Sequence, residues 1–190
     1  MKDSLFIRGK VPMTKAEVRA VSISKLELPP DAVVYDVGAG TGSVTIEMAL
    51  QLPQGTVYAI ERNSDAVDLL HQNCEKFGVS NVKIVPGLAP EALKELPAPT
   101  HVFIGGSSGN LICIMEAALE KNPRVRFVIN AIALETVAEA LEALKSLPVT
   151  DSDIVTAMIG ESKEIGRYHM MMGQNPVYVI SCTGKGEEDE

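Results

Sequence analysis

Three glycines at alternate positions, Gly38, Gly40 and Gly42, follow a run of β-type residues at 33–37. Glycine accepts positive φ angles and lets a ligand lie directly on the backbone. The apolar pattern of residues 44–51 is typical of a helix, whose first N–H groups would point at that ligand. The sequence therefore predicts a cofactor site on a strand, a glycine turn and a helix, although such a turn can also serve only to close a β–α unit.

Two carboxylates accompany this turn and help to identify the cofactor. Glu61 ends a second β-type run about 20 residues after the turn, where an acidic side chain holds a ribose diol. Asp36 ends the first run, where it would repel a pyrophosphate but suits the cationic methionine end of S-adenosylmethionine. The dinucleotide fingerprint also requires a glycine at the position of Ser43. The pattern resembles motif I of the class I S-adenosylmethionine-dependent methyltransferases, which favours that cofactor over a dinucleotide.

The composition fits one globular domain, and we expect it to cover residues 1–183, with an N-terminal segment and helix inside 1–30. Residues 184–190 are predicted to form a disordered acidic tail. No apolar run is long enough for a membrane span, and the first residues lack a signal-peptide pattern. The three cysteines are odd in number and widely spaced, which suits neither disulfides nor a metal cluster and indicates the cytoplasm.

The formal net charge of −8 argues against nucleic-acid binding, because phosphate contacts need a basic surface. Residues 1–25 are nevertheless basic, with six cationic and two anionic side chains. Such an edge can attract an anionic small molecule, or it can be an ordinary solvated helix face.

Alternating strand and helix patterns predict an α/β fold with a doubly wound, mainly parallel sheet. The last two of seven strands are expected to be antiparallel neighbours, so that one strand near the C-terminus runs against the others. Thr14 and Glu17 form a capping box, which predicts a helix beginning at about Lys15. The predicted strands are 33–37, 56–61, 82–85, 101–104, 125–132, 153–160 and 176–183, and the predicted helices are 15–25, 44–51, 63–77, 111–121 and 135–147.

The loops at the carboxyl ends of these strands carry further candidate site residues. Leu88 and Ala89, after the third strand, can contact an adenine ring or belong to a plain connection. The loop after the fourth strand either lets a large flat ligand approach the backbone or is a flexible surface turn. Its residues are Gly105, Gly106, Ser107, Ser108, Gly109 and Asn110.

Residues 160–175 are predicted to be a loop between the last two strands, and they contain Arg167, His169 and three methionines at 170–172. Pliable methionine beside a cation can cover an aromatic macrocycle that carries carboxylates, or it can pack in a subunit interface, which we slightly favour. The three histidines and the serines of the glycine-rich loop show no nucleophile-elbow spacing, so Ser-His catalysis is not expected.

Four segments together make a narrower resemblance than the glycine turn alone. They are residues 7–19, 37–47, 103–110 and 129–136. Over residues 5–183 the sequence is similar to the cobalt-precorrin C(15)-methyltransferases (decarboxylating) of anaerobic cobalamin synthesis. The same domain forms the C-terminal half of the fused aerobic precorrin-6Y methylase.

The resemblance implies methyl transfer from S-adenosylmethionine to carbon 15 of an anionic tetrapyrrole, decarboxylation of its carbon 12 acetate, and a homotetramer. The matched positions imply cofactor contacts by Thr14, Gly38, Ala39, Gly40, Thr41, Gly42, Glu61 and Ala89, in addition to the Asp36 argued above. We expect no protein-bound metal and no strong general base. We hypothesise that the substrate carboxylates bind Arg8, Lys10, Lys15 and Arg167.

Three other functions stay open from the sequence. Another class I methyltransferase could act on a small molecule or on RNA, although the negative net charge weakens the RNA version. A nicotinamide-dependent oxidoreductase is disfavoured by Ser43 and Asp36. A non-catalytic cofactor-binding module would bind S-adenosylmethionine without turnover.

Overall fold

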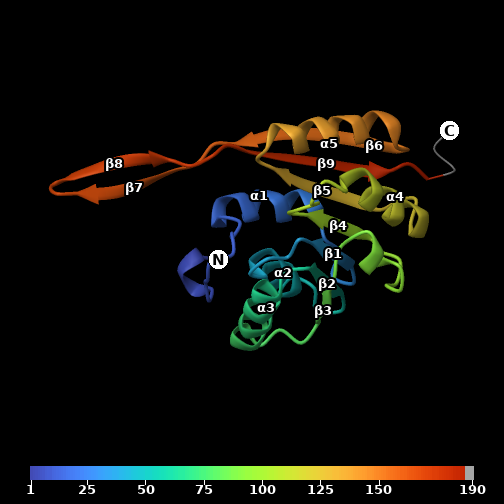
Figure 1. The fold of residues 1–190 in the computed structure, drawn as a ribbon, viewed down its shortest axis with the longest axis horizontal. Helices are drawn as coiled ribbons and strands as arrows, with labels where there is room; N and C mark the ends of the chain where they lie inside the picture. The colour runs from blue at the N-terminus through green and yellow to red at the C-terminus, as the bar shows by residue number, and fades with distance from the viewer. Residues whose placement is uncertain (187–190) are drawn as a thin grey trace.

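The structure is a computed structural model, and it describes residues 1–186. Helices and strands alternate along most of this part of the chain (Figure 1). The helices are η1 (Asp3–Leu5), α1 (Ala16–Leu26), α2 (Ser43–Ala49), α3 (Ser64–Phe77), η2 (Glu91–Leu93), α4 (Leu111–Lys121) and α5 (Leu134–Ser146). The strands are β1 (Val33–Val37), β2 (Thr56–Glu61), β3 (Val82–Pro86), β4 (His101–Ile104), β5 (Arg126–Ala131), β6 (Val149–Ala157), β7 (Gly160–Ile165), β8 (Tyr168–Gly173) and β9 (Val177–Gly184).

Within residues 1–186, seven strands form one sheet in the order β3-β2-β1-β4-β5-β9-β6. Strands β1 to β5 are parallel to one another, whereas β9 is antiparallel to both β5 and β6. The predicted doubly wound, mainly parallel sheet with one antiparallel strand is therefore confirmed. Because β1 and β4 are neighbours, the turn after β1 and the loop after β4 meet at one edge of the sheet.

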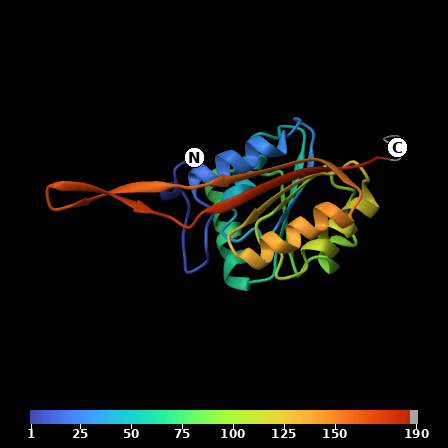
Figure 2. The ribbon, with the colours of Figure 1, turned by 90° about the horizontal axis from the view of Figure 1, so that it is seen from above.

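The two faces of the sheet are covered by different helices, as the turned view shows (Figure 2). On one face, α1 and α2 pack Val18, Ile23, Leu26, Val44 and Met48 against Val34, Phe103 and Val128 of the sheet. On the other face, α4 and α5 pack Ile114, Met115, Ala140 and Ala143 against Val37, Ile104 and Phe127. Alternate residues of each strand thus serve opposite layers, as the period of a strand requires.

The helix caps agree with the sequence at α3 and differ from it at α1. The sequence offers Asn63 or Ser64 as the cap of α3 and Gly78 as its end. In the structure the side chain of Asn63 accepts hydrogen bonds from Asp65 N and Ala66 N, and Gly78 follows the last helical residue. The capping box at Thr14 is wrong: α1 begins at Ala16, its N-cap is Lys15, and no described side chain caps it. Thr14 lies one residue too early to cap, because it belongs to a segment that lines the cavity described below.

The predicted loop 160–175 is mostly a β-hairpin, which corrects the sequence reading. Strands β7 and β8 pair antiparallel, from Gly160 with Gly173 to Ile165 with Tyr168. This hairpin extends far from the body of the molecule (Figure 1). All its strand residues are exposed, so no alternation between buried and exposed positions was available to indicate strands.

The C-terminal segment is ordered beyond the predicted start of the tail. Gly184 belongs to β9 and donates a backbone hydrogen bond to Val125 O at 2.8 Å, and Lys185 N donates to Pro148 O at 2.8 Å. The rest of the predicted tail, residues 187–190, lies outside the described residues. No helix in the described part of the chain is long and apolar enough to cross a membrane.

Candidate cofactor pocket

The glycine turn between β1 and α2 depends on glycine for two different reasons. Gly38 and Gly40 have φ angles of 75° and 57°, and a Cβ on Gly38 would lie 2.8 Å from both N and O of Gly106. The turn and the loop after β4 therefore approach each other backbone to backbone. Gly42 differs: it is the N-cap of α2, and its Cβ would lie 2.1 Å from Leu70 Cδ1 of α3. Gly42 serves packing and does not line the cavity.

A cavity of about 890 Å³ opens beside this turn, at the carboxyl ends of the parallel strands. It brings together five segments that the sequence had singled out separately: the residues before α1, the glycine turn, the end of β2, the loop after β3 and the loop after β4. The predicted cofactor residues that line it are Thr14, Asp36, Gly38, Ala39, Gly40, Thr41, Glu61 and Ala89. Their convergence from distant parts of the chain makes this cavity the candidate cofactor site.

The Glu61 carboxylate is held in place at the end of β2 by two backbone groups. Its Oε2 accepts a hydrogen bond from Gly40 N at 2.9 Å, and its Oε1 accepts one from Asn63 N at 2.8 Å. Each carboxylate oxygen keeps further acceptor capacity, because an ionised carboxylate offers about four lone-pair sites. A fixed pair of acceptors in the cavity suits a vicinal diol such as that of a ribose.

Asp36 places a second carboxylate in the cavity, and this one is fully buried. Burial is the main cause that raises the pKa of Asp36 to about 7; the hydrogen bond from the Thr45 hydroxyl to Oδ2 opposes this rise, and the nearby charge of Glu61 adds to it. Among the described residues, no group donates to Oδ1. Burial disfavours the ionised form of such a carboxyl, and a cation that binds next to it stabilises that ionised form.

The loop after β4 forms the opposite wall of the cavity. Gly105, Gly106, Ser107, Ser108 and Gly109 all line it, and Gly109 has a φ angle of 80°. The last predicted member of the loop, Asn110, donates a hydrogen bond from Nδ2 to Ala89 O at 3.4 Å and is not part of the lining. The wall therefore offers mostly backbone groups to a ligand.

The four predicted substrate-binding cations occupy three different kinds of position. Lys15 lines the cavity, and its Nζ lies 3.6 Å from an oxygen of Asp3. Arg8 and Lys10 are exposed on the segment before α1 and do not line the cavity. Arg167 lies in the turn between β7 and β8, with its guanidinium 5.9 Å from the centre of the Tyr168 ring. The structure thus separates Arg167 from the cavity of its own chain (Figure 1).

Several cavity residues escaped the sequence analysis. Asn130 follows the strand-end rule and could have been found at the end of β5, because its neighbours were already predicted to be a strand. Gln174 and Asn175 could not, because they reach the cavity only as the chain returns from the hairpin. Arg62 and Thr136 also line the cavity and carried no sequence signal.

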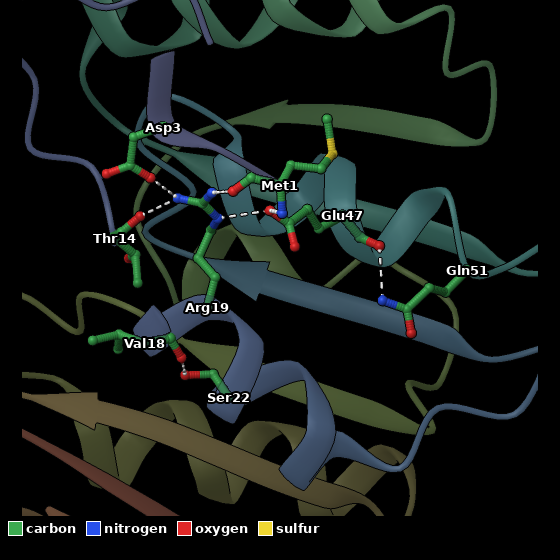
Figure 3. Close-up of polar contacts among 8 residues, drawn as sticks. All are labelled: Met1, Asp3, Thr14, Val18, Arg19, Ser22, Glu47 and Gln51. Carbon is green, nitrogen blue, oxygen red and sulfur yellow. Dashed lines mark hydrogen bonds and ion pairs between the residues drawn. The ribbon is translucent and has the colours of Figure 1, made fainter. Parts of the chain in front are cut away.

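Arg19 is a further residue whose role the sequence did not reveal. It counted as one of the cations of the basic N-terminal edge, yet it is fully buried in α1. It donates hydrogen bonds to Asp3 Oδ1 at 2.7 Å, to Glu47 Oε1 at 2.9 Å, and to the carbonyl oxygens of Thr14 and Met1 (Figure 3). A buried charge needs such partners, and these partners fix the N-terminal segment against α1 and α2.

A family model described as the precorrin methyltransferase domain matches residues 5–183. The chain belongs to the precorrin methyltransferase family. Membership makes it a methyltransferase that uses S-adenosylmethionine, which confirms the class of enzyme that the sequence predicted. The Asp36 acceptor, the bare turn at Gly38 and Gly40, and the fixed Glu61 carboxylate fit that cofactor.

Individual relatives cover nearly the whole of this precorrin methyltransferase. A probable cobalt-precorrin-6B C(15)-methyltransferase (decarboxylating) of Pyrobaculum calidifontis is 43% identical over 183 residues, which are 95% of this chain and 93% of that protein. The cobalt-precorrin-6B C(15)-methyltransferase (decarboxylating) of Salmonella typhimurium is 42% identical over 184 residues, 96% of this chain and 95% of that protein.

Solved structures agree with the family. A precorrin-6Y C5,15-methyltransferase from Geobacter metallireducens has a TM-score of 0.90 and 38% identity, with 96% of both chains covered. A precorrin 8W decarboxylase from Methanobacterium thermoautotrophicum has a TM-score of 0.89 and 37% identity, covering 97% of this chain and 99% of that one. An S-adenosylmethionine-dependent O-methyltransferase from Thermotoga maritima, at a TM-score of 0.77 and 18% identity, shares the class I fold.

Proposed function

We propose that this enzyme transfers a methyl group from S-adenosylmethionine to carbon 15 of cobalt-precorrin-6B and decarboxylates the acetate side chain on carbon 12. The relatives at 34–43% identity carry this activity in their names, and they align with this chain over almost its entire length. The structural observation that carries the proposal is the cavity itself. It continues from the glycine turn past the loop after β4 to the ends of β5 and β9, which leaves room for a second, larger ligand beside the cofactor.

The cofactor end of the cavity is the part lined by Asp36, the glycine turn and Glu61. Glu61 would accept the ribose hydroxyls, and Asp36 would face the cationic methionine end. Thr14 and Ala89 would close the site from the segment before α1 and the loop after β3. When bound, S-adenosylmethionine supplies an electrophilic methyl group on a sulfonium. The residues named here bind and orient it.

The proposed reaction requires the protein mainly to position the two reactants. The methyl acceptor is an electron-rich ring carbon, so aligning it with the methyl group supplies much of the rate. In keeping with this, none of the three histidines lines the cavity within residues 1–186. Electrons released by decarboxylation pass into the conjugated macrocycle, so the proposal requires no protein-bound metal.

The carboxylates of the tetrapyrrole need cationic partners. Lys15 is placed for this inside the cavity, and Arg8 and Lys10 flank it on the same segment. The backbone-lined wall at residues 105–109 suits the flat face of a macrocycle. Arg167 stays a candidate only for a neighbouring copy of the chain, because its hairpin projects from the body.

We also propose a cytoplasmic homotetramer held by the β7–β8 hairpin. An isolated two-stranded hairpin is marginally stable in water, and this one exposes Ile165, Tyr168 and the three methionines at 170–172. Pairing with other copies would cover these apolar side chains. Nucleic acid and membranes are not expected partners, given the net charge of −8.

Mass spectrometry of cobalt-precorrin-6B after incubation with enzyme and S-adenosylmethionine tests the main proposal. The expected product has gained one methyl group and lost carbon dioxide. A parallel reaction with tRNA and methyl-labelled cofactor tests the RNA alternative. The proposal is overturned if the enzyme binds S-adenosylhomocysteine but leaves the tetrapyrrole mass unchanged, or if label enters tRNA instead.

A further inference from the structure

The segment before α1, residues 6–15, forms a strap that lies first along α3 and then along the cavity. The Phe6 ring is 4.9 Å from the Phe77 ring, and a Cβ on Gly9 would lie 3.1 Å from Leu69 Cδ1. Between these contacts, Ile7 is bonded to Asn73. The α3 residues 69, 73 and 77 recur every four positions, so they form one stripe on the helix that the strap follows in the opposite direction.

The second half of the strap, residues 11–15, lines the cavity. It lies close to the glycine turn, since a Cβ on Gly40 would be 3.4 Å from Pro12 O. Its far end is fixed by the hydrogen bond from Arg19 to Thr14 O (Figure 3). The strap is thus held at both ends, on α3 and on Arg19, and its cavity-lining part lies between these two attachments.

Asn73 joins the strap to the glycine turn directly. Its fully buried side chain accepts a hydrogen bond from Ile7 N at 2.7 Å through Oδ1. Its Nδ2 donates to Ile7 O at 3.0 Å and to Thr41 O at 2.9 Å. Both hydrogens of the amide nitrogen are therefore used, one on the strap and one on the turn. The amide cannot rotate without losing a hydrogen bond to each segment.

We propose that Asn73 is a positioning residue that couples cofactor binding at the glycine turn to the placement of the strap. The inference rests on the proposed function, because it takes the turn to be the cofactor site. A cofactor on the turn fixes Thr41, Thr41 O fixes the amide of Asn73, and the amide fixes Ile7 and the residues that follow it. Those residues include Arg8 and Lys10, the proposed partners of the substrate carboxylates.

The coupling works in both directions, because an equilibrium coupling between two sites is reciprocal. A substrate that binds the strap cations holds the strap on α3, and through Asn73 it holds the turn in its binding geometry. Either ligand is therefore expected to raise the affinity of the enzyme for the other by the same factor.

Asn81 offers a matched control within the same chain. Its part-buried amide also donates to backbone carbonyls, namely Ala49 O at 2.9 Å, Leu52 O at 2.8 Å and, at a longer 3.4 Å, Gly55 O. These bonds tie the chain segment after α2, and Asn81 does not line the cavity. Asn81→Ala removes a comparable set of hydrogen bonds without touching the strap or the turn.

The experiment measures hydrogen exchange and affinity on the full chain, with S-adenosylhomocysteine as the probe. Residues 6–9 lie outside the cavity lining, so a bound ligand does not shield them directly. In the wild type, saturating S-adenosylhomocysteine should slow their amide exchange. In Asn73→Ala this protection should be lost and the Kd should rise roughly 10-fold, the size of a typical coupling between sites.

Asn81→Ala should keep both the protection and the Kd, even where its Tm falls as much as that of Asn73→Ala. The inference is overturned if the ligand leaves exchange at residues 6–9 of the wild type unchanged, a result that needs no variant to fold. It is also overturned if both variants weaken binding equally. A wild type that fails to bind the probe overturns the proposed function as well, whereas intact binding without coupling overturns this inference alone.

Discussion

The Glu61 carboxylate at the end of β2 accepts a hydrogen bond from the backbone N–H of Gly40, 2.9 Å away in the turn after β1. This bond joins the two segments that are proposed to contact the cofactor. It also gives Glu61 a structural duty alongside its proposed contact with the ribose.

Glu61→Gln should weaken S-adenosylhomocysteine binding by about 10-fold or more, since a hydrogen bond to a charged group is worth about 1.5–3 kcal/mol. In the wild type, each carboxylate oxygen accepts a hydrogen bond from a backbone N–H, one from Gly40 and one from Asn63. In the variant the NH2 group replaces one of these oxygens, so one backbone N–H would lose its acceptor. Isothermal titration calorimetry measures the Kd. Glu95→Gln, exposed and outside the cavity lining, is the control and should leave the Kd unchanged.

Cofactor affinity should fall as the pH drops through about 7. Burial holds the pKa of Asp36 near that value, so below it the carboxyl is neutral in the free protein and attracts a cationic ligand less. Calorimetry from pH 6 to pH 8.5 should show this dependence in the wild type and a much flatter profile in Asp36→Asn. A wild-type affinity that is constant across this range would contradict the assignment of Asp36 to the cationic end.

The same carboxyl should make the free protein less stable at alkaline pH. Its folded pKa lies above its ordinary value, so its contribution to stability is present at acid pH and is lost as the pH rises through about 7. Asp36→Asn removes the cost of charging and should raise the Tm at pH 8 by about 4 °C or more. Thermal unfolding at pH 5 and pH 8 measures the Tm of both proteins. The difference in Tm between the variant and the wild type should be smaller at pH 5 than at pH 8.

Gly38→Ala should destabilise the protein and abolish detectable cofactor binding. Its φ angle of 75° is strained for alanine, and the new Cβ would lie 2.8 Å from backbone atoms of Gly106. Gly78→Ala is the matched control, because its φ angle is 64° but no described atom lies within 4 Å of the new Cβ. In the control, the free energy of unfolding should fall by only about 1–2 kcal/mol, which is the cost of a left-handed backbone conformation for alanine. Denaturant unfolding measures both variants. If their free energies of unfolding fall equally, the backbone at Gly106 moves away from the new Cβ at little cost, which would contradict this prediction.

Reversing the strap cations should affect the tetrapyrrole and spare the cofactor. Arg8→Glu combined with Lys10→Glu should raise the substrate KM at least about 10-fold, since each lost charged contact is worth about 1.5–3 kcal/mol. The Kd for S-adenosylhomocysteine, measured without substrate, should change little. Lys94→Glu combined with Lys145→Glu, at two exposed residues outside the cavity lining, controls for the same change in net charge. An unchanged KM would reject the role of both cations.

Substituting Met171→Lys in the hairpin should dissociate the oligomer. This side chain is 68% exposed in the isolated chain, and a charge there opposes burial against another copy. Light scattering coupled to gel filtration should find a tetramer for the wild type and smaller species for the variant. Leu50→Lys, at an apolar residue that is also exposed but follows α2 outside the hairpin, should leave the tetramer intact. A monomeric wild type would remove the proposed role of the hairpin.

The sequence predicted features that depend on local pattern. Strands β1 and β2 begin and end at the predicted residues. The position of Glu61 could be predicted because six residues are enough to recognise a strand that ends in a carboxylate. The Asn63 cap and the Gly78 end of α3 follow from the same kind of local chemistry. The parallel direction of the first five strands follows from the alternation of strands with helices.

The sequence could not predict features that depend on what packs against a residue. Gly42 shares the spacing of Gly38 and Gly40, but it faces Leu70 of α3 and leaves the cavity to the other two. Thr14 has the right spacing for a capping box, yet the strap draws it to the cavity. In the sequence, Arg19 and Asn73 look like ordinary polar helix residues. Their roles depend on contacts with the N-terminal segment, which only the folded structure shows.

The hairpin could not be predicted from the sequence because neither of its faces is covered within one chain. Its position in the chain has a structural consequence. Gln174 and Asn175 follow β8 at once and form part of the cavity wall, where Gln174 N is bonded to Ile159 O at 2.9 Å. In the proposed homotetramer, a neighbour bound to the hairpin would therefore also restrain Gln174 and Asn175. Assembly and the shape of the cavity would then be linked through one continuous stretch of backbone.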